Sequence, residues 1–271
     1  MNIDPPDRFA IHTSGLTRRF GDVIAVDHIA LRVPYGEIFG LLGANGAGKS
    51  TVIKMLTTLL SPSSGMAEVG GFNIISSPAD VRRRIGYVSQ LLSADGALTG
   101  YENLRLSAKL YDLPKSEREE RIRSALEFMG LVDSANKLVR TYSGGMIRRL
   151  ELAQAMLHRP AILFLDEPTI GLDPVARHTV WERLRDLRRD FGMTVLITTH
   201  DMEEAESLCD RLAIMHKGQI SVVGTPAELR AELGDGANMD DVFVHYAGGS
   251  IQESGTFREI VQNRRAAHRL G

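Results

Sequence analysis

The segment from Gly43 to Ser50 has the pattern Gly-x-x-x-x-Gly-Lys-Ser, with a strand-like apolar run before it and an apolar-periodic run after it. Glycines allow successive backbone N–H groups to turn inward around an anion, and the following helix adds the positive end of its dipole. Lys49 is placed to reach the outer phosphates of a nucleotide, and the Ser50 hydroxyl suits Mg²⁺. The segment therefore predicts a nucleotide-binding loop between a strand and a helix, which is an α/β arrangement.

Strands and one helix are predicted on either side of this loop. Alternating residues from Phe9 to Val33, with a turn at Gly21-Asp22, favour a pair of antiparallel strands. The apolar periodicity after the loop predicts a helix that ends at Leu60, before the Ser- and Pro-rich residues 61–65. Residues 84–90 then form another short stretch typical of a strand.

The second half of the chain alternates between helical and buried-strand patterns. Helical periodicity prevails between residues 91 and 159, which we interpret as a helical subdomain. Two continuous apolar runs follow, Ala161–Leu165 and Met193–Thr199, with a predicted helix between them. Such runs are typical of parallel strands that are covered on both faces. The order predicts a parallel sheet in the centre of the molecule.

Composition restricts the class of protein. A formal net charge of −2 over 271 residues provides no strong basic field, so nucleic acid is not expected as a partner. The only cysteine, Cys209, excludes an internal disulfide, and we expect it to be a small buried residue in a reducing compartment. The N-terminus lacks the pattern of a signal peptide, and no apolar run reaches the roughly 20 residues that span a bilayer. We therefore expect the chain in the cytoplasm.

Two adjacent carboxylates, Asp166 and Glu167, directly follow the first apolar run. They are expected at the C-terminal end of a strand, where open α/β sheets place their ligand crevice. Asp166 suits a metal ligand, and Glu167 suits the orientation or deprotonation of an attacking water. A solvent-facing pair at a strand end is the alternative. With the loop upstream, the pair favours hydrolysis of a nucleoside triphosphate.

Ser143, Gly144 and Gly145 precede another predicted helix and form a second potential anion site. Kinases and GTPases also contain phosphate loops, but a soluble kinase would not explain this Ser-Gly-Gly segment. The order of the motifs resembles that of the ATP-binding cassette (ABC) family, the nucleotide-binding subunits of ABC transporters. The resemblance extends from Ala10 to about Leu233.

The resemblance implies a P-loop NTPase (RecA-like) core with an antiparallel β subdomain and a helical subdomain over about residues 91–159. We assign residues 9–233 to the cassette. Residues 234–271 are expected to form a C-terminal tail that is regulatory or that contacts a dimer partner.

The resemblance also implies roles for single residues. Phe20 resembles the aromatic residue that stacks on adenine, Gln90 the Q-loop residue near Mg²⁺, His200 the switch histidine at the γ-phosphate, and Asp173 a residue of the D-loop. Without the family, a core position is the lesser alternative for Phe20, and Gln90 and His200 alone are more often ordinary polar residues at strand ends. Glu167, His200 and Gln90 are the predicted catalytic residues, and Ser50, Gln90 and Asp166 the predicted Mg²⁺ ligands. The predicted ATP contacts are Phe20, Gly43, Asn45, Gly46, Gly48, Lys49, Ser50, Thr51, Ser143, Gly144, Gly145 and Asp173.

The signature departs from the usual Leu-Ser-Gly-Gly-Gln of the family. Tyr142 stands in the Leu position and Met146 in the Gln position, while the phosphate-facing residues between them are intact. Tyr-Ser-Gly-Gly-Met followed by Arg148-Arg149 is similar to the branch of daunorubicin-resistance-type drug exporters and of some polysaccharide and lipid exporters. This similarity favours export of a drug, lipid or glycan over import.

The chain has one phosphate loop and one signature, and in this family the signature of another cassette covers the bound ATP. The resemblance therefore implies a second cassette, in the simplest case a homodimer, and an integral membrane permease that contacts the region from Gln90 to about Tyr111. The chain would then act at the cytoplasmic face of the membrane. The alternative is an ATP-driven clamp on DNA or the ribosome. The lack of a long coiled-coil insertion and of a basic excess is evidence against a clamp.

Overall fold

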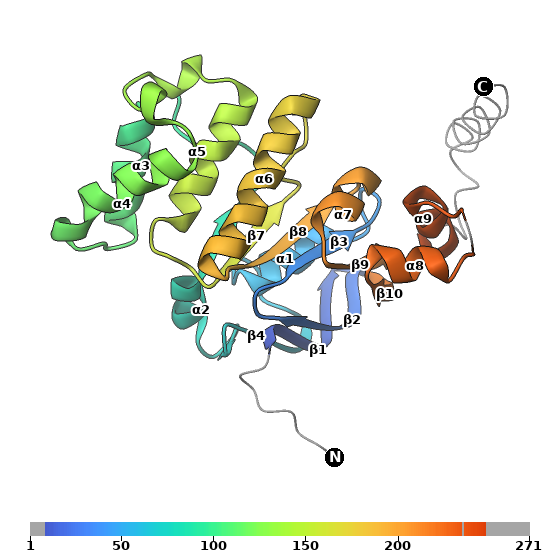
Figure 1. Cartoon of the computed structure of the whole chain (residues 1–271). Helices are drawn as coiled ribbons and strands as arrows, with labels where there is room; N and C mark the ends of the chain where they lie inside the picture. The colour runs from blue at the N-terminus through green and yellow to red at the C-terminus, as the bar shows by residue number, and fades with distance from the viewer. Residues whose placement is uncertain (1–8, 235, 248–271) are drawn as a thin grey trace, which may run out of the picture.

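Six strands form the central sheet in a computed structural model, which describes residues 9–234 and 236–247 (Figure 1). Their order is β10-β9-β3-β8-β7-β6, and all run parallel except β10, which pairs antiparallel with β9. They are β3 (Ile38–Leu42), β6 (Ile85–Val88), β7 (Ile162–Asp166), β8 (Thr194–Thr199), β9 (Arg211–His216) and β10 (Gln219–Gly224). The two apolar runs of the sequence are the neighbouring parallel strands β7 and β8, as predicted.

Both faces of β7 are covered, and alternate residues belong to different hydrophobic cores. Ile162 and Phe164 pack in the core that contains helix α1 (Lys49–Leu56), whereas Leu163 and Leu165 pack in the core of the opposite face. All residues of the strand are buried. A strand buried on both faces needs no polar alternation, which explains its continuous apolar sequence.

A second, antiparallel sheet lies on the α1 side of the central sheet (Figure 1). Its order is β2-β1-β4-β5, with β1 (Phe9–Phe20), β2 (Val23–Pro34), β4 (Ser64–Val69) and β5 (Phe72–Asn73). Ile11 and Leu31 of this sheet share a core with Val52 and Ile53 of α1. Helix α1 is thus held between two sheets, and the predicted P-loop NTPase fold with an antiparallel β subdomain is confirmed.

Helix α1 ends at Leu56, so the predicted end at Leu60 was wrong. The Thr57 hydroxyl donates to the Ile53 carbonyl oxygen at 2.8 Å, and Thr58 has a φ of 64°. A β-branched residue in the left-handed region interrupts a helix, but its conformation leaves no signal in the apolar periodicity.

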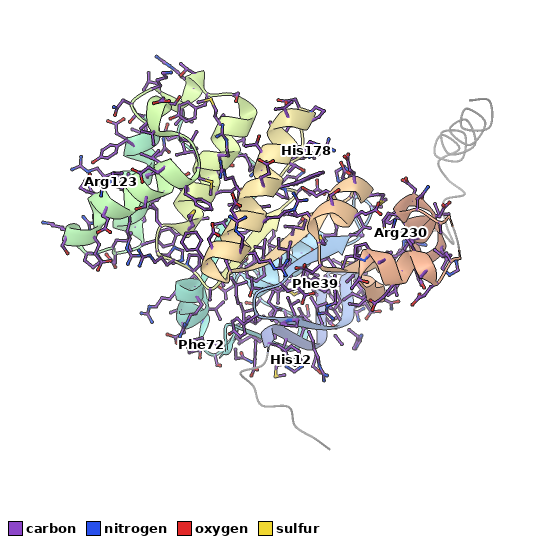
Figure 2. All side chains as sticks on the ribbon, viewed as in Figure 1. His12, Phe39, Phe72, Arg123, His178 and Arg230 are labelled. Carbon is purple, nitrogen blue, oxygen red and sulfur yellow. The ribbon has the colours of Figure 1, made fainter. Side chains whose placement is uncertain are left out.

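The other face of the central sheet is covered by helices α3, α5 and α6, with α4 beside them (Figure 1). These are α3 (Gly100–Leu110), α4 (Lys115–Phe128), α5 (Gly144–Met156) and α6 (Pro174–Phe191); α2 (Pro78–Arg84) precedes β6, and two 3₁₀ turns span Val132–Ser134 and Val139–Thr141. Trp181 of α6 is fully buried in this layer. Figure 2 shows His178 on α6 and Arg123 on α4, farther from the sheet.

The C-terminal part of the described chain packs against β9. It contains α7 (Met202–Leu208), α8 (Pro226–Ala231) and α9 (Met239–Ala247). Val242 and Phe243 of α9 share a core with Leu212 and Ile214 of β9. The expected C-terminal tail therefore begins within a packed region, and its residues 248–271 lie outside the described part of the chain.

Cys209 is buried at the end of α7, as its sequence context predicts. Its sulfur faces Gly40 in the middle of β3, where a Cβ would lie 2.6 Å from Sγ and 3.3 Å from the Leu212 Cβ. Glycine at position 40 thus allows α7 to approach the sheet closely.

The Gly40→Ala change is expected to lower the free energy of unfolding by about 1–3 kcal/mol, the usual cost of overpacking a tight core. Urea unfolding measures the loss, with Cys209→Ala and the double variant as controls. Because removal of the sulfur makes room for the new methyl group, the double variant should lose less than the sum of the single losses. Simple additivity would contradict this packing.

Candidate functional site

The loop between β3 and α1 contains glycine where a side chain would clash or where the backbone conformation favours glycine. A Cβ on Gly43 would lie 2.6 Å from the Met215 carbonyl oxygen, and one on Gly48 would lie 2.4 Å from the Ala25 carbonyl oxygen. Gly46 and Gly48 have φ values of 81° and 105°, a region that favours glycine. Neighbouring segments thus pack closely against Gly43 and Gly48, whereas Gly46 faces open space. This arrangement leaves room for an anion beside the loop backbone.

Lys49 begins α1, and its side chain folds back into the loop. Nζ donates to the carbonyl oxygens of Gly43 at 2.7 Å and Ala44 at 3.2 Å, and it lies 3.4 Å from Glu167 Oε1. Burial lowers the pKa of Lys49, and the carboxylates of Glu167 and Asp166 oppose that shift. The two carboxylates therefore favour the charged ammonium at the place where phosphate charge would bind.

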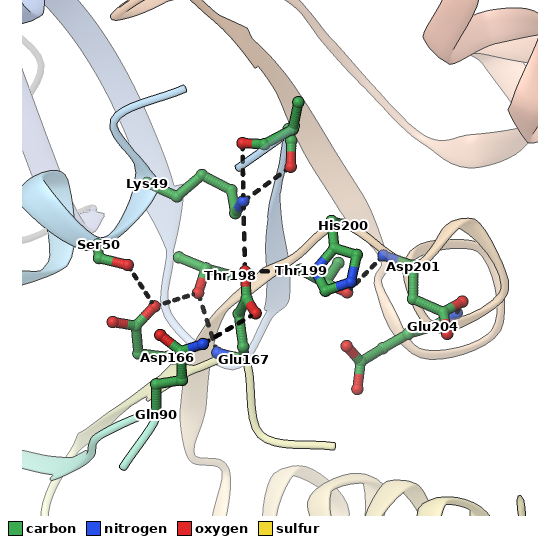
Figure 3. A network of polar contacts seen from close by, with 12 residues as sticks. Lys49, Ser50, Gln90, Asp166, Glu167, Thr198, Thr199, His200, Asp201 and Glu204 are labelled. Carbon is green, nitrogen blue, oxygen red and sulfur yellow. Dashed lines mark hydrogen bonds and ion pairs between the residues drawn. The ribbon is translucent and has the colours of Figure 1, made fainter. Parts of the chain in front are cut away.

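Asp166 ends β7, and two hydroxyl groups donate to the same oxygen of its carboxylate (Figure 3). Ser50 Oγ lies 3.0 Å and Thr198 Oγ1 2.6 Å from Asp166 Oδ1. Thr198 Oγ1 also accepts from the Glu167 N–H at 3.0 Å. Sequence reasoning missed Thr198, although a polar residue near the end of an apolar strand beside β7 was the available signal.

Gln90 and His200 approach Glu167 from two other segments (Figure 3). Gln90 Nε2, from the loop after β6, donates to Glu167 Oε2 at 3.5 Å, and His200 Nδ1, just after β8, lies 3.3 Å from Glu167 Oε1. Glu167 has a φ of 50°, a costly conformation that its neighbours maintain. The fold thus brings the three predicted catalytic residues together around one carboxylate.

A cavity of about 410 Å³ opens above this cluster. Its lining includes the predicted residues Asn45, Gly46, Gly48, Lys49, Ser50, Thr51, Gln90 and Glu167. A glycine-rich loop at a helix N-terminus and the Lys49 ammonium suit phosphate, and the adjoining Ser50 hydroxyl and Asp166 carboxylate are the oxygen ligands that Mg²⁺ prefers. The residues present therefore fit a nucleoside triphosphate and its metal ion.

Comparison with known proteins identifies the family. The family described as ABC transporter matches residues 26–170. The daunorubicin/doxorubicin resistance ATP-binding protein DrrA of Streptomyces peucetius is 46% identical over 234 residues, which are 86% of this chain and 70% of that protein. This chain belongs to the ABC transporter family. As a member with an intact phosphate loop and carboxylate pair, it is an ATP-binding subunit with ATPase activity.

Solved structures of ABC subunits share the fold. One, described as the ATP-binding subunit of an ABC transporter, has a TM-score of 0.77 and 31% identity, covering 88% of this chain and 99% of its own. Another, the dimeric ATP-binding cassette MJ0796 in a post-hydrolysis state bound to ADP and Pi, has a TM-score of 0.71 and 25% identity, covering 79% and 98%.

Several predicted ATP contacts of this ABC subunit lie outside the phosphate cavity. Phe20 is 47% exposed at the end of β1, where the Arg18 guanidinium lies 4.6 Å from its ring centroid. Ser143 is exposed at the start of α5, and Asp173 is exposed at the start of α6. Each caps its helix by accepting a backbone N–H, Ser143 from Met146 and Asp173 from Ala176. One chain therefore assembles only part of the predicted constellation.

The signature glycines have a packing role that the sequence did not reveal. A Cβ on Gly145 would lie 2.7 Å from the Ala176 Cβ, and one on Gly144 would lie 3.3 Å from Leu172 Cδ2. The signature end of α5 therefore rests directly on the first turn of α6. Tyr142 is buried, and its hydroxyl donates to the Ser134 carbonyl oxygen at 2.6 Å, so the unusual residue anchors the turn before α5.

Glu204 of α7 is a second residue that sequence reasoning missed. It is 1% exposed, and its Oε1 accepts from Thr169 Oγ1 at 2.7 Å and from Trp181 Nε1 at 2.9 Å. Thr169 lies shortly after Glu167 in the chain, and Glu204 lies shortly after His200. The Glu204 carboxylate therefore links the segment of Glu167 to the segment of His200. Burial raises the pKa of Glu204 against the effect of these hydrogen bonds.

The Glu204→Gln change is expected to stabilise the protein relative to the parent as pH rises above the ordinary Glu value of 4.5. The folded parent retains its proton above this pH while the unfolded chain loses it, so the free energy of unfolding falls until pH passes the raised pKa. Glutamine keeps the acceptor oxygen without this loss. Urea unfolding from pH 4 upward measures the difference.

Glu203→Gln is the matched control, because the Glu203 side chain is 61% exposed. Its stability should follow the parent at every pH. A Glu204→Gln profile parallel to that of the parent would show that burial leaves this carboxyl unaffected.

Proposed function

We propose that this chain is the ATP-hydrolysing subunit of an exporter, in which two cassettes act together on a separate membrane permease at the cytoplasmic face. One observation carries the proposal. The chain assembles its phosphate loop, Gln90 and Glu167 around one cavity, with Asp166 bound to Ser50 and His200 beside Glu167, yet the Ser143 end of α5 is exposed. A second chain is the natural source of the missing half of the site.

A two-fold homodimer satisfies both halves at once, because each chain then gives its signature to the other. The relative MJ0796 is described as dimeric with ADP and Pi bound, which supports this arrangement. Exposed Asp173 at the start of α6 lies on the segment next to Gly144 and Gly145, so it would face the same partner.

Within each site, the residues have separate roles in hydrolysis. Lys49 and the loop N–H groups bind the phosphates, and Glu167 orients or deprotonates the attacking water. Gln90 and His200 hold the Glu167 carboxylate at its two oxygens. Ser50, Asp166 and Gln90 would hold Mg²⁺, which supplies charge neutralisation at the phosphates when bound.

Apolar side chains near Gln90 provide a docking surface for the permease. Leu91 is 81% exposed and Leu92 55%, and both directly follow Gln90 in the loop. No helix within residues 9–234 and 236–247 is long and apolar enough to span a membrane. A helix of a membrane subunit that covers these leucines would couple its own movement to the loop of Gln90.

Export of a drug, lipid or glycan is the direction and substrate class that we propose. The Streptomyces relative is named for resistance to daunorubicin and doxorubicin, which supports a drug exporter. The substituted signature Tyr142 to Met146 and the following Arg148-Arg149 favour the same branch.

Mixing two inactive variants tests the shared site. Lys49→Ala and Ser143→Glu chains should each hydrolyse ATP very slowly, because every site of each homodimer lacks one half. Random pairing in an equal mixture makes half of the dimers mixed, each with one intact site, so activity should return to about a quarter of the parent rate. A steady-state phosphate-release assay measures it. An inactive mixture, or full activity of dilute Ser143→Glu chains, would exclude the shared site.

Membrane association tests the transporter. The tagged parent chain, expressed in its own host, is expected to co-purify with a multi-spanning membrane protein. The Leu91→Asp/Leu92→Asp variant should keep its ATP hydrolysis in solution but lose this partner, because charged side chains cannot replace buried apolar area. Capture of the parent chain on DNA or ribosomes in place of a membrane protein would favour a clamp.

A further inference from the structure

A buried ion pair lies on α5, one turn after the signature glycines, and neither of its residues is among the predicted site residues. Arg148 NH1 lies 3.0 Å from Glu151 Oε2, and each side chain is 2% exposed. Both residues lie on the same face of the helix, three positions apart, as side chains that contact each other on a helix must. Neither has a role in the proposed chemistry.

The pair holds the loop that carries Gln90. Arg148 donates to the carbonyl oxygens of Ser89 at 2.8 Å and Gln90 at 3.2 Å. At the other end of the loop, Glu151 Oε1 accepts from the Ser93 N–H and from Ser93 Oγ, the latter at 3.1 Å. The backbone on both sides of Leu91 and Leu92 is thus fixed to α5, although these two side chains remain exposed.

Stability alone does not explain this pair. Removal of two charges from water is costly, and apolar residues of the same size are often equally stable or better at such positions. The charges instead provide directional hydrogen bonds to a segment of irregular backbone, which apolar packing does not supply. Burial lowers the pKa of Arg148, and the charges of Glu151 and Asp166 oppose that shift.

We propose that Arg148 and Glu151 are positioning residues that set Gln90 against Glu167, so that hydrolysis depends on the position of α5. Gln90 Nε2 lies 3.5 Å from Glu167 Oε2, at the limit of a hydrogen bond, so a small shift of the loop would break this contact. The same helix begins at Ser143. The inference rests on the proposed function in one respect, that Ser143 contacts the nucleotide of a partner chain. The link between the ion pair and Gln90 lies within the single chain.

This link gives α5 two ends with different tasks. Its first turn lies at the surface where a second cassette would bind, and its second and third turns hold the loop beside Glu167. A displacement of the helix when chains pair therefore moves Gln90 with it. The exposed leucines of the same loop transmit the displacement to whatever covers them.

The test separates positioning from folding with an apolar replacement of the pair. Single variants Arg148→Met and Glu151→Leu each leave one buried charge without its partner and should lower Tm. The Arg148→Met/Glu151→Leu double variant removes both charges and should recover most of the Tm. Its kcat should nevertheless fall about 10- to 100-fold, which is the usual effect of misplacing a group in an active site. The KM for ATP should stay within about twofold of the parent value.

A cycle with Gln90→Ala shows whether the pair acts through Gln90. In the Gln90→Ala background, the same double replacement should change kcat by less than about twofold, because the group that it positions is already absent. Single-turnover measurements on the full-length chain with excess protein resolve these slow rates. The Arg183→Met/Asp186→Leu variant is the control. This pair has the same spacing on α6, Arg183 NH1 lies 3.1 Å from Asp186 Oδ2, and neither residue lines the cavity.

Recovery of kcat together with Tm in the double variant would assign the pair a purely structural role. If the double replacement lowered kcat by the same factor in the Gln90→Ala background as in the parent, the pair would not act through Gln90. Either result overturns the inference while the mixing of Lys49→Ala and Ser143→Glu chains still succeeds. Failure of that mixing experiment removes the shared site and leaves the cycle unaffected.

Discussion

The register of the parallel strands determines where the chemistry lies. Asp166 of β7 lies opposite Thr198 of β8, and Leu42 of β3, just before the phosphate loop, lies opposite Thr199. The carboxyl ends of three neighbouring strands thus place the loop, the metal-binding carboxylate and the hydroxyl that supports it at one edge of the sheet. A slip of one residue in either pairing would turn these side chains to the other face.

The charged groups at this edge of the sheet are stabilised by one another and by hydrogen bonds, and not by solvent. Lys49 and Glu167 are 4% and 8% exposed in their side chains, so each depends on the other and on backbone dipoles for stabilisation. The Glu167 backbone conformation is strained, and its N–H is held by both the Thr198 hydroxyl and the Thr198 carbonyl oxygen. These contacts keep the carboxylate pointed into the cavity, where Gln90 and His200 reach it.

The sequence was sufficient for groups whose chemistry depends on neighbours along the chain. The phosphate loop, the Asp166-Glu167 pair and the two parallel strands follow from local pattern, and the fold places them as expected. Thr198 and Glu204 were missed because their importance arises from contacts between distant segments, and a Thr or Glu alone carries no such signal. The end of α1 at Leu56 was also missed, since the left-handed backbone conformation of Thr58 leaves no signal in the apolar periodicity. The roles of all the predicted site residues stay predictions, and Phe20, Ser143 and Asp173 also lie outside the cavity that one chain forms.

The sealed position of Cys209 has a practical consequence. Burial raises the pKa of its thiol well above the ordinary value, so the folded protein offers almost no reactive thiolate. Because it is the only cysteine in the chain, labelling of the native protein reports exposure of this one site, by separation of α7 from β3 or by unfolding. A cysteine introduced on an exposed helix can then be labelled selectively with a fluorescent probe. The much slower labelling of Cys209 in the same sample measures the rate at which its buried position opens.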